Sequence, residues 1–216
     1  MKKILILGGC GYIGSTLVPK LLKSGYKVNV IDNLWFGENL KKDKNLKIIK
    51  KDIRNLKSED FKNINTVIHL ANIANDPAVD LRPELSWEVN VLATKQICDL
   101  AIKNNVNKII FASSGSVYGI KKEKRVHEKL DLVPISVYNK TKMIAERVLL
   151  SYKDKIDIIC VRPATVCGIS QRMRLDVSVN MLTYQALKFK KIKVFGGKQF
   201  RPSIHIQDLT NLFKFF

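Results

Sequence analysis

Residues 4–14, ILILGGCGYIG, carry the strongest indication of the fold. Four apolar residues, Ile4–Leu7, run into glycines that fit G-x-G-x-x-G through Gly9, Gly11 and Gly14. Glycine permits a tight turn and lets the backbone approach a ligand closely. A helix that starts at such a turn offers unpaired N–H groups and its positive dipole end to an anion. The stretch therefore predicts a strand, a phosphate-binding turn and a helix.

An acidic residue, Asp32, occupies the sequence position at which dinucleotide-binding folds carry the carboxylate that binds the adenosine ribose. Asp32 ends the next apolar run, in VID, about 20 residues beyond Gly11. A carboxylate there accepts from two ribose hydroxyls and repels a 2′-phosphate, which predicts NAD in preference to NADP. The glycines also fit G-x-x-G-x-x-G, which begins at Gly8. The alternative is a glycine-rich turn without a ligand, but the strand–turn–helix–strand context favours the nucleotide.

Apolar, β-branched runs alternate with segments of helical period along the chain. The predicted strands are Ile4–Leu7, Val28–Ile31, Leu46–Ile49, Thr66–Leu70, Lys108–Ala112 and Ile156–Val161. The predicted helices are Ile13–Lys23, Leu85–Lys103 and 136–152, and the predicted loops are Gly37–Asn45 and Lys121–Pro134. Several strands are unbroken apolar runs, as in sheets buried on both faces. The order predicts an α/β fold with a doubly wound parallel sheet, Rossmann-like, with right-handed crossovers.

The composition is that of a globular protein with one well-buried core: 216 residues, 46% hydrophobic and 26% charged. The four cysteines form no C-x-x-C pair, which indicates reduced thiols in a cytoplasmic protein and no metal site. No apolar run is long enough to span a bilayer, so no membrane association is expected.

The formal net charge of +19 raises the question of a nucleic-acid partner. Lysines recur along the whole chain with only short clusters, such as Lys41–Lys44 and Lys121–Lys124. No recognition helix or aromatic-basic strand accompanies them, which favours a solvated lysine-rich surface over nucleic-acid binding. A positive field also suits a small substrate that carries phosphates.

Polar side chains from one predicted helix and one predicted strand end point to acid–base chemistry. Tyr138 and Lys142 are four residues apart, hence neighbours on one helix face, and Ser113 and Ser114 end the fifth predicted strand. A phenol has a pKa of about 10, which a nearby ammonium and a cationic nicotinamide would lower. Tyr138 would then take a proton from a substrate hydroxyl, Ser114 would hold that oxygen, and Lys142 would bind the nicotinamide ribose.

The motifs GGCGYIG, VIDN, KKDIR, HLAN, SSGSVYG and YNKTK together resemble the extended short-chain dehydrogenase/reductase family, the NAD-dependent nucleotide-sugar epimerases and dehydratases. The resemblance spans essentially the whole chain. It implies bound NAD, a nucleoside-diphosphate sugar as substrate, and Ser114, Tyr138 and Lys142 as catalytic residues. The cofactor-binding residues that it implies are Gly8, Gly11, Tyr12, Ile13, Gly14, Asp32, Asn33, Asp52, Ile53, Leu70, Ala71, Asn90, Lys142 and Pro163. The substrate-binding residues that it implies are Ser114, Tyr138, Asn180 and Arg201.

The sequence departs from this family at two places. Sugar 4,6-dehydratases carry an Asp–Glu pair after the hydroxyl residue, but this chain has Gly115 and Ser116, which are neither acids nor bases near neutral pH. A nucleotide-sugar decarboxylase would also need an acid in this turn. The resemblance therefore predicts an epimerase that oxidises C4 and returns the hydride to the other face. The alternatives are a 4-ketoreductase and a non-catalytic NAD-binding protein. The second departure is Thr165, where many relatives have Asn.

The same resemblance predicts an NAD-binding domain over 1–165 and a partial substrate-binding region over 166–216, interleaved with that domain. Relatives commonly have a longer C-terminal lobe, so we expect a truncated chain, a naturally short member, or a chain completed by a partner, and turnover could be lost in it. Relatives often dimerise through two helices, here 85–103 and 136–152, so a homodimer is expected. The stretch IHIQDLTNLFKFF at 204–216 predicts an amphipathic helix, and His69 is expected to be a hydrogen-bonded core residue.

Overall fold

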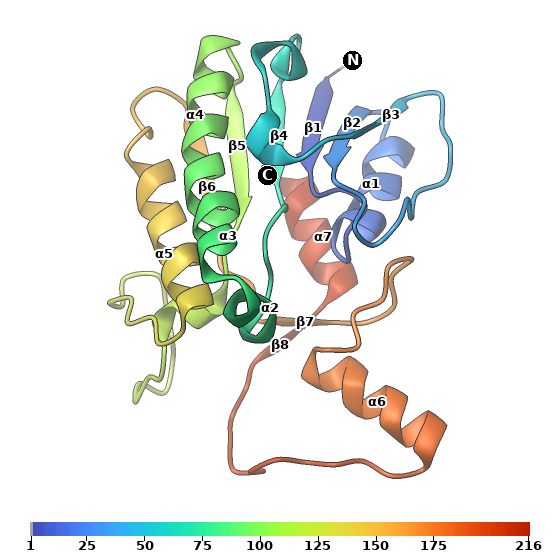
Figure 1. Cartoon of the computed structure of the whole chain (residues 1–216), viewed down its shortest axis with the longest axis vertical. Helices are drawn as coiled ribbons and strands as arrows, with labels where there is room; N and C mark the ends of the chain where they lie inside the picture. The colour runs from blue at the N-terminus through green and yellow to red at the C-terminus, as the bar shows by residue number, and fades with distance from the viewer. Residues whose placement is uncertain (1) are drawn as a thin grey trace.

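The computed structural model describes residues 2–216, which are built around a six-stranded sheet (Figure 1). The strands are β1 (Lys3–Leu7), β2 (Lys27–Asp32), β3 (Leu46–Lys50), β4 (Thr66–His69), β5 (Lys108–Ala112) and β6 (Asp157–Val161). All neighbouring strands are parallel, in the order β3-β2-β1-β4-β5-β6. This order confirms the Rossmann-like prediction. Chain direction across the sheet reverses between β1 and β4, the point at which such sheets bind ligands beyond the strand ends.

Helices cover both faces of the sheet. On one face lie α1 (Gly14–Lys23) and α7 (Ile206–Phe215), whose Leu17 and Phe213 are buried against the sheet. On the other face lie α4 (Ala93–Lys103) and α5 (Val137–Leu150), whose apolar residues form the second core cluster. Each helix has an apolar stripe at intervals of three and four residues, which is the pattern that requires burial on one side only.

The predicted helix Leu85–Lys103 is not one continuous α-helix. It consists of α3 (Pro83–Trp87), a π-helical segment η3 (Glu88–Leu92) and then α4, and a short helix α2 (Asp76–Leu81) precedes it. A proline at the first position of α3 is compatible with a helix start and not with continuation from α2. The π-helical turn carries the buried Asn90, and periodicity alone does not reveal such a turn.

The predicted loops contain no regular helix or strand, as expected. Three 3₁₀ turns lie near the carboxyl ends of strands or soon after them: η1 (Ile53–Asn55), η2 (Ser58–Phe61) and η4 (Gly115–Tyr118). These turns place backbone and polar side chains at the edge of the sheet where the predicted site residues collect.

The last fifty residues leave the sheet and return to it (Figure 1). A short strand β7 (Thr165–Cys167) pairs with β8 (Ser203–His205) in a separate two-stranded sheet, and α6 (Ser178–Phe189) extends away from the core. The predicted terminal helix is α7, which packs against α1. No helix between residues 2 and 216 has both the length and the apolar content needed to cross a bilayer.

Candidate active site

The glycine turn is packed tightly against its surroundings at Gly8, Gly9 and Gly14, and a Cβ at Gly9 would lie 2.7 Å from the Val30 side chain. A Cβ at Gly8, whose φ is +82°, would lie 2.6 Å from the backbone nitrogen of Ala71. A Cβ at Gly14 would lie 2.4 Å from the carbonyl oxygen of Gly9. Leu70 and Ala71 follow β4 and both donate their N–H groups to the carbonyl oxygen of Leu7. Glycine at 8 and 14 therefore lets the turn, β4 and α1 approach one another.

Gly11 is less crowded than these glycines. A Cβ there would meet only the carbonyl oxygen of Gly8, at 3.3 Å. Helix α1 begins just after Tyr12 and Ile13, and no side chain caps it. The N–H groups of a first helical turn lack intrahelical acceptors. A helix start without a side-chain cap, next to a glycine, fits a pyrophosphate, so these residues can hold the phosphates of a dinucleotide.

Asp32 holds the turn as well as standing at the ribose position. One carboxylate oxygen accepts the N–H of Cys10 at 2.9 Å, and the other accepts the N–H of Leu34 at 2.9 Å. A carboxylate oxygen has more than one acceptor site, so both oxygens can still receive ribose hydroxyls. The next residue, Asn33, accepts the N–H of Trp35 at 3.2 Å. The sequence motif did not reveal that Asp32 also fixes the glycine turn.

Asp52 caps a turn at the end of β3. Its carboxylate accepts the backbone N–H of Arg54 at 2.8 Å and is also paired with the Arg54 guanidinium. These hydrogen bonds lower the pKa of Asp52, against a smaller opposing effect of burial. Ile53 is buried in the core beside it. The Asp52 carboxylate is thus committed to Arg54, which in turn contacts Glu88.

Lys142 lies in the interior, at the carboxyl end of β5. Its side chain is 3% exposed, and its nitrogen donates to the carbonyl oxygen of Ala112 at 2.7 Å. The ammonium also lies 4.6 Å from the centre of the Phe111 ring. Burial lowers the pKa of Lys142 to about 7, while the charge of Glu146 acts in the opposite direction. A lysine in this environment titrates near neutral pH.

Tyr138 lies one helical turn before Lys142, but the expected lowering of its pKa is wrong for the chain alone. Burial raises the pKa of the phenol above its usual value. Arg174 provides the largest opposing effect, followed by the side chains of Ser114 and Asn72. The Lys142 nitrogen is instead bonded to Ala112, so it is not the cation that favours the phenolate.

Ser114 caps the 3₁₀ turn η4 at the end of β5. Its hydroxyl lies 2.7 Å from that of Ser116 and accepts the N–H of Ser116 at 3.2 Å. The N–H of Gly115 donates to the carbonyl oxygen of Pro163 at 2.8 Å, and a Cβ at Gly115 would lie 3.1 Å from that oxygen. This turn therefore presses against the end of β6, which brings Pro163 to the edge that carries Ser114.

Asn90 and His69 have structural partners. The Asn90 side chain, 2% exposed, accepts the N–H of Ile73 at 2.9 Å and donates to Thr141 Oγ1 at 3.1 Å. It thus supports the residue next to Lys142. His69 contacts Thr94 at 3.0 Å, and burial together with the Lys142 charge lowers its pKa to about 3. The core assignment of His69 is confirmed, although its Nδ1 has no partner within residues 2–216.

The residues predicted on the sugar side separate into two groups. Asn180 is 7% exposed and donates to the Tyr12 hydroxyl at 3.0 Å, while that hydroxyl donates to the carbonyl oxygen of Gly168 at 2.8 Å. The Ser170 hydroxyl donates to the carbonyl oxygen of Tyr12 at 2.7 Å. The segment after β7 therefore crosses the glycine turn, and Asn180 holds it there.

Arg201 is not brought to the other site residues. It lies in an exposed segment before β8, and its guanidinium donates to Gln199 at 2.9 Å. Within residues 2–216 no hydrogen bond or ion pair joins Arg201 to Ser114, Tyr138 or Lys142. Arg174 is the arginine near the phenol, and it forms an ion pair with Asp176 at 2.6 Å.

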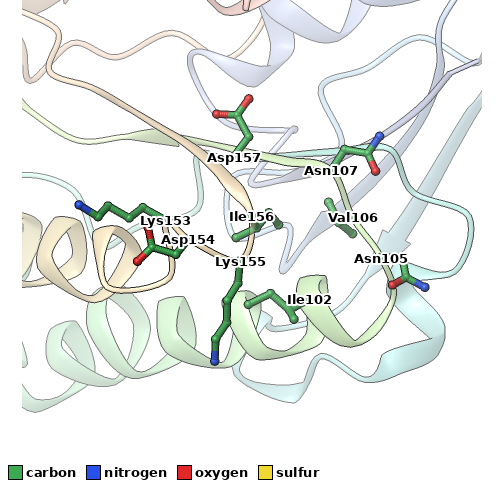
Figure 2. Close-up of a pocket in the computed structure, with 9 residues that line it drawn as sticks. All are labelled: Ile102, Asn105, Val106, Asn107, Lys153, Asp154, Lys155, Ile156 and Asp157. Carbon is green, nitrogen blue, oxygen red and sulfur yellow. The ribbon is translucent and has the colours of Figure 1, made fainter.

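A surface pocket lies at the opposite edge of the sheet, where β5 and β6 begin (Figure 2). Its volume is about 720 Å³. The residues that line it come from the end of α4, from the segments that precede the two strands and from the start of β6: Ile102, Asn105, Val106, Asn107, Lys153, Asp154, Lys155, Ile156 and Asp157. Open parallel sheets bind their ligands beyond the carboxyl ends of the strands. This pocket is therefore separate from the site that holds Tyr138 and Lys142.

Residues 4–216 match the NAD dependent epimerase/dehydratase family. The chain belongs to this family. The match confirms the resemblance given by the sequence motifs, and the family's dependence on NAD agrees with the predicted cofactor. The glycine turn and the carboxylate of Asp32 are compatible with that cofactor.

Relatives in this family include nucleotide-sugar enzymes of several kinds. UDP-glucose 4-epimerase of Lactobacillus helveticus is 33% identical over 175 residues, which is 78% of this chain and 53% of that enzyme. UDP-glucuronic acid 4-epimerase from Bacillus cereus, solved with UDP-glucuronic acid and NAD, superposes with a TM-score of 0.87 at 32% identity, covering 96% of this chain and 70% of that one. The NAD dependent NDP-hexosamine 5,6-dehydratase TunA, involved in tunicamycin biosynthesis, gives 0.91 at 27% identity, covering 99% and 71%. The chain therefore spans about half of one relative and about seven tenths of the two structures.

Proposed function

We propose that this protein is an NAD-dependent nucleotide-sugar epimerase that acts at C4 of the sugar. The proposal rests mainly on one observation: Lys142 is bonded to Ala112 at the carboxyl end of β5, and Ser114, which follows that strand, lies close to Tyr138 on the same helix as Lys142. The family membership supports it, and so do the epimerases among the relatives at 32% and 33% identity. When bound, NAD supplies the redox step by accepting a hydride from the sugar carbon and returning it.

The protein's own residues would hold and move the proton. Tyr138 Oη would take the proton of the sugar hydroxyl as its carbon is oxidised and return it at the end of the cycle. Ser114 Oγ, which lies close enough to lower the pKa of the Tyr138 phenol, would donate a hydrogen bond to the same sugar oxygen. Lys142 would bind the nicotinamide ribose through its ammonium group. Because burial alone raises the pKa of Tyr138, the phenolate would depend on cations: Arg174 and the oxidised nicotinamide.

The turn after Ser114 supports epimerisation over dehydration. Gly115 and Ser116 leave this turn without a carboxylate, and a Cβ at Gly115 would already lie 3.1 Å from the carbonyl oxygen of Pro163. A dehydratase needs an acid–base pair to remove a C–H proton and a hydroxyl, and this turn has no group that does either. An epimerase needs only the proton exchange at Tyr138 and a sugar that can turn within the site.

The test is an assay of the purified chain with NAD and, in turn, UDP-glucose, UDP-N-acetylglucosamine and UDP-glucuronic acid. We expect inversion at C4, followed by NMR of the sugar, without net formation of NADH. Consumption of added NADH with a 4-keto sugar would identify a ketoreductase instead. Binding of NAD with no conversion of any of these sugars or their 4-keto forms would contradict the epimerase and favour a non-catalytic NAD-binding protein.

A further inference from the structure

A buried carboxylate, Glu146, lies one helical turn beyond Lys142 on α5. It is 1% exposed and forms an ion pair with Arg162. The Arg162 guanidinium donates from Nη2 at 2.7 Å and from Nε to both carboxylate oxygens at 3.0 and 3.1 Å. The hydroxyl of Ser113 donates to the same carboxylate. Glu146 thus receives hydrogen bonds from two strand ends.

The residues bonded to Glu146 lie next to the segments that carry the predicted catalytic residues. Ser113 precedes Ser114, and Arg162 precedes Pro163 at the end of β6. The Nη1 group of Arg162 donates to the Tyr118 hydroxyl at 2.8 Å. Tyr118 is the last residue of η4, the turn that Ser114 caps. Glu146 and Arg162 therefore join α5, the end of β5, the end of β6 and η4 at one point.

The stability of the fold alone is a weak explanation for this arrangement. Removing two charges from water costs several kcal/mol, and well-packed apolar residues often stabilise a fold as well as a buried ion pair does. The pair here is also extended by Ser113 and Tyr118. Fully satisfied buried networks of this kind specify one geometry, and the geometry specified here is that of the site.

Glu146 is also the buried anion nearest to Lys142 along α5. Within residues 2–216 no ion pair involves Lys142 itself, whose hydrogen bond goes to Ala112. The titratable groups that face Lys142 from the packed elements are Glu146 on α5, Cys160 on β6 and His69 on β4. Glu146 raises the pKa of Lys142 and so opposes the effect of burial.

We propose that Glu146 is a positioning residue for the site: its carboxylate favours the ammonium form of Lys142 one helical turn away, and its bonds to Ser113 and Arg162 hold the Ser114 turn against α5. The inference deepens the proposed function and rests on it where turnover is concerned. Its consequence for NAD affinity rests only on the role of the Lys142 ammonium at the ribose. In this role Glu146 contacts neither substrate nor cofactor and acts only through Lys142 and Ser114.

The test compares Glu146→Gln with wild-type protein as a function of pH. NAD affinity should decline as the pH rises through the pKa of Lys142, and in Glu146→Gln this decline should move to lower pH by about one unit. The alkaline limb of the kcat profile should move in the same direction. At neutral pH, kcat should fall by about 10- to 100-fold with a smaller change in KM, because the reacting groups lose alignment.

Two further variants keep the result interpretable. Glu146→Gln leaves the partly buried Arg162 guanidinium without its carboxylate. The double variant Glu146→Gln/Arg162→Met removes both charges, and it should fold and still show the shift to lower pH. Glu146→Asp should return the limb toward its wild-type position. Asp60→Asn is the matched control because it breaks another buried ion pair, with Lys51 at 2.8 Å; it should lower stability without moving the limb.

The inference would be overturned if the folded double variant showed the wild-type pH dependence of NAD affinity and of kcat. It would also be overturned if the loss of kcat in Glu146→Gln only followed the folded fraction. The NAD measurement separates this inference from the proposed function. A wild-type protein that binds NAD and converts no sugar contradicts the epimerase, while the pH dependence of NAD affinity still decides the role of Glu146.

Discussion

The nitrogen of Lys142 lies 2.7 Å from the carbonyl oxygen of Ala112, the last residue of β5. This bond attaches the helix that carries Tyr138 to the strand that delivers Ser114. It also holds an amine in the protein interior, where the charged form is unfavourable. The protonation state of this amine therefore affects both the stability of the fold and the predicted chemistry.

We expect Lys142 to make the protein more stable at alkaline pH. Its pKa is lowered from 10.5 to about 7, so between these values the unfolded chain binds one proton more than the folded chain. The free energy of unfolding therefore rises with pH across this window, because binding the additional proton stabilises the unfolded chain less as the pH rises. Lys142→Met should remove the rise in chemical-denaturation midpoints, whereas Lys95→Met, at an exposed lysine, should keep it. An unchanged slope in Lys142→Met would contradict the assignment.

His69 should make the fold sensitive to acid. Burial and the Lys142 charge lower its pKa from 6.5 to about 3, so the unfolded chain binds the additional proton between these values. Stability should fall as the pH falls through that window, by an amount on the order of a few kcal/mol. His69→Gln should flatten this part of the urea-denaturation profile, and His127→Gln, in an exposed loop, is the control. Parallel profiles for His69→Gln and wild type would refute the prediction.

Tyr138→Phe should separate chemistry from cofactor binding. The variant keeps the ring and loses the hydroxyl that exchanges the proton, so sugar turnover should drop by about 100-fold or more. NAD affinity, measured by calorimetry, should remain nearly unchanged. Tyr152→Phe removes a hydroxyl that contacts Asp99 on the outer surface and should retain activity. Persistent turnover in Tyr138→Phe would mean that another group moves the proton.

The glycine turn offers a paired test of folding against binding. Gly14→Ala places a Cβ 2.4 Å from a backbone oxygen and should destabilise the fold by about 1–3 kcal/mol. Gly11→Ala meets only one atom at 3.3 Å, so it should fold while its methyl group occupies space that the pyrophosphate requires. We expect the NAD affinity of Gly11→Ala to fall by about tenfold or more, with a smaller loss of thermal stability than in Gly14→Ala. Equal losses of stability in both variants would exclude this division of roles.

The sequence predicted the sheet well because its strands are apolar runs with few alternative readings. All six predicted strands are present, each end within one residue of its expected position. The parallel arrangement of the sheet follows from the alternation of strands and helices, and the position of the glycine turn follows from the motif at 4–14. Ser114, Tyr138 and Lys142 could be named from spacing because the strand end and the helix that carry them meet at one edge.

Other features depended on contacts that spacing does not encode. The pKa of Tyr138 is set by burial and by Arg174, which lies in a segment after β7 whose path the sequence did not predict. Glu146 was missed, although its position four residues after Lys142 on a buried face was a usable signal. No sequence motif marks Arg162, and its ion pair with Glu146 is visible only in the folded structure.

The π-helical segment Glu88–Leu92 makes the geometry of the site depend on the number of residues in this segment. A π-helical turn holds one residue more than an α-helical turn does, so deleting a single residue there would let α3 and α4 continue as one regular helix. The deletion would swing the Asn90 carboxamide by about 100° around the axis relative to α4, away from Ile73 and Thr141. Gaining or losing one residue at this spacer would thus disconnect the loop after β4 from α5, while leaving every side chain of the predicted Ser–Tyr–Lys set chemically intact.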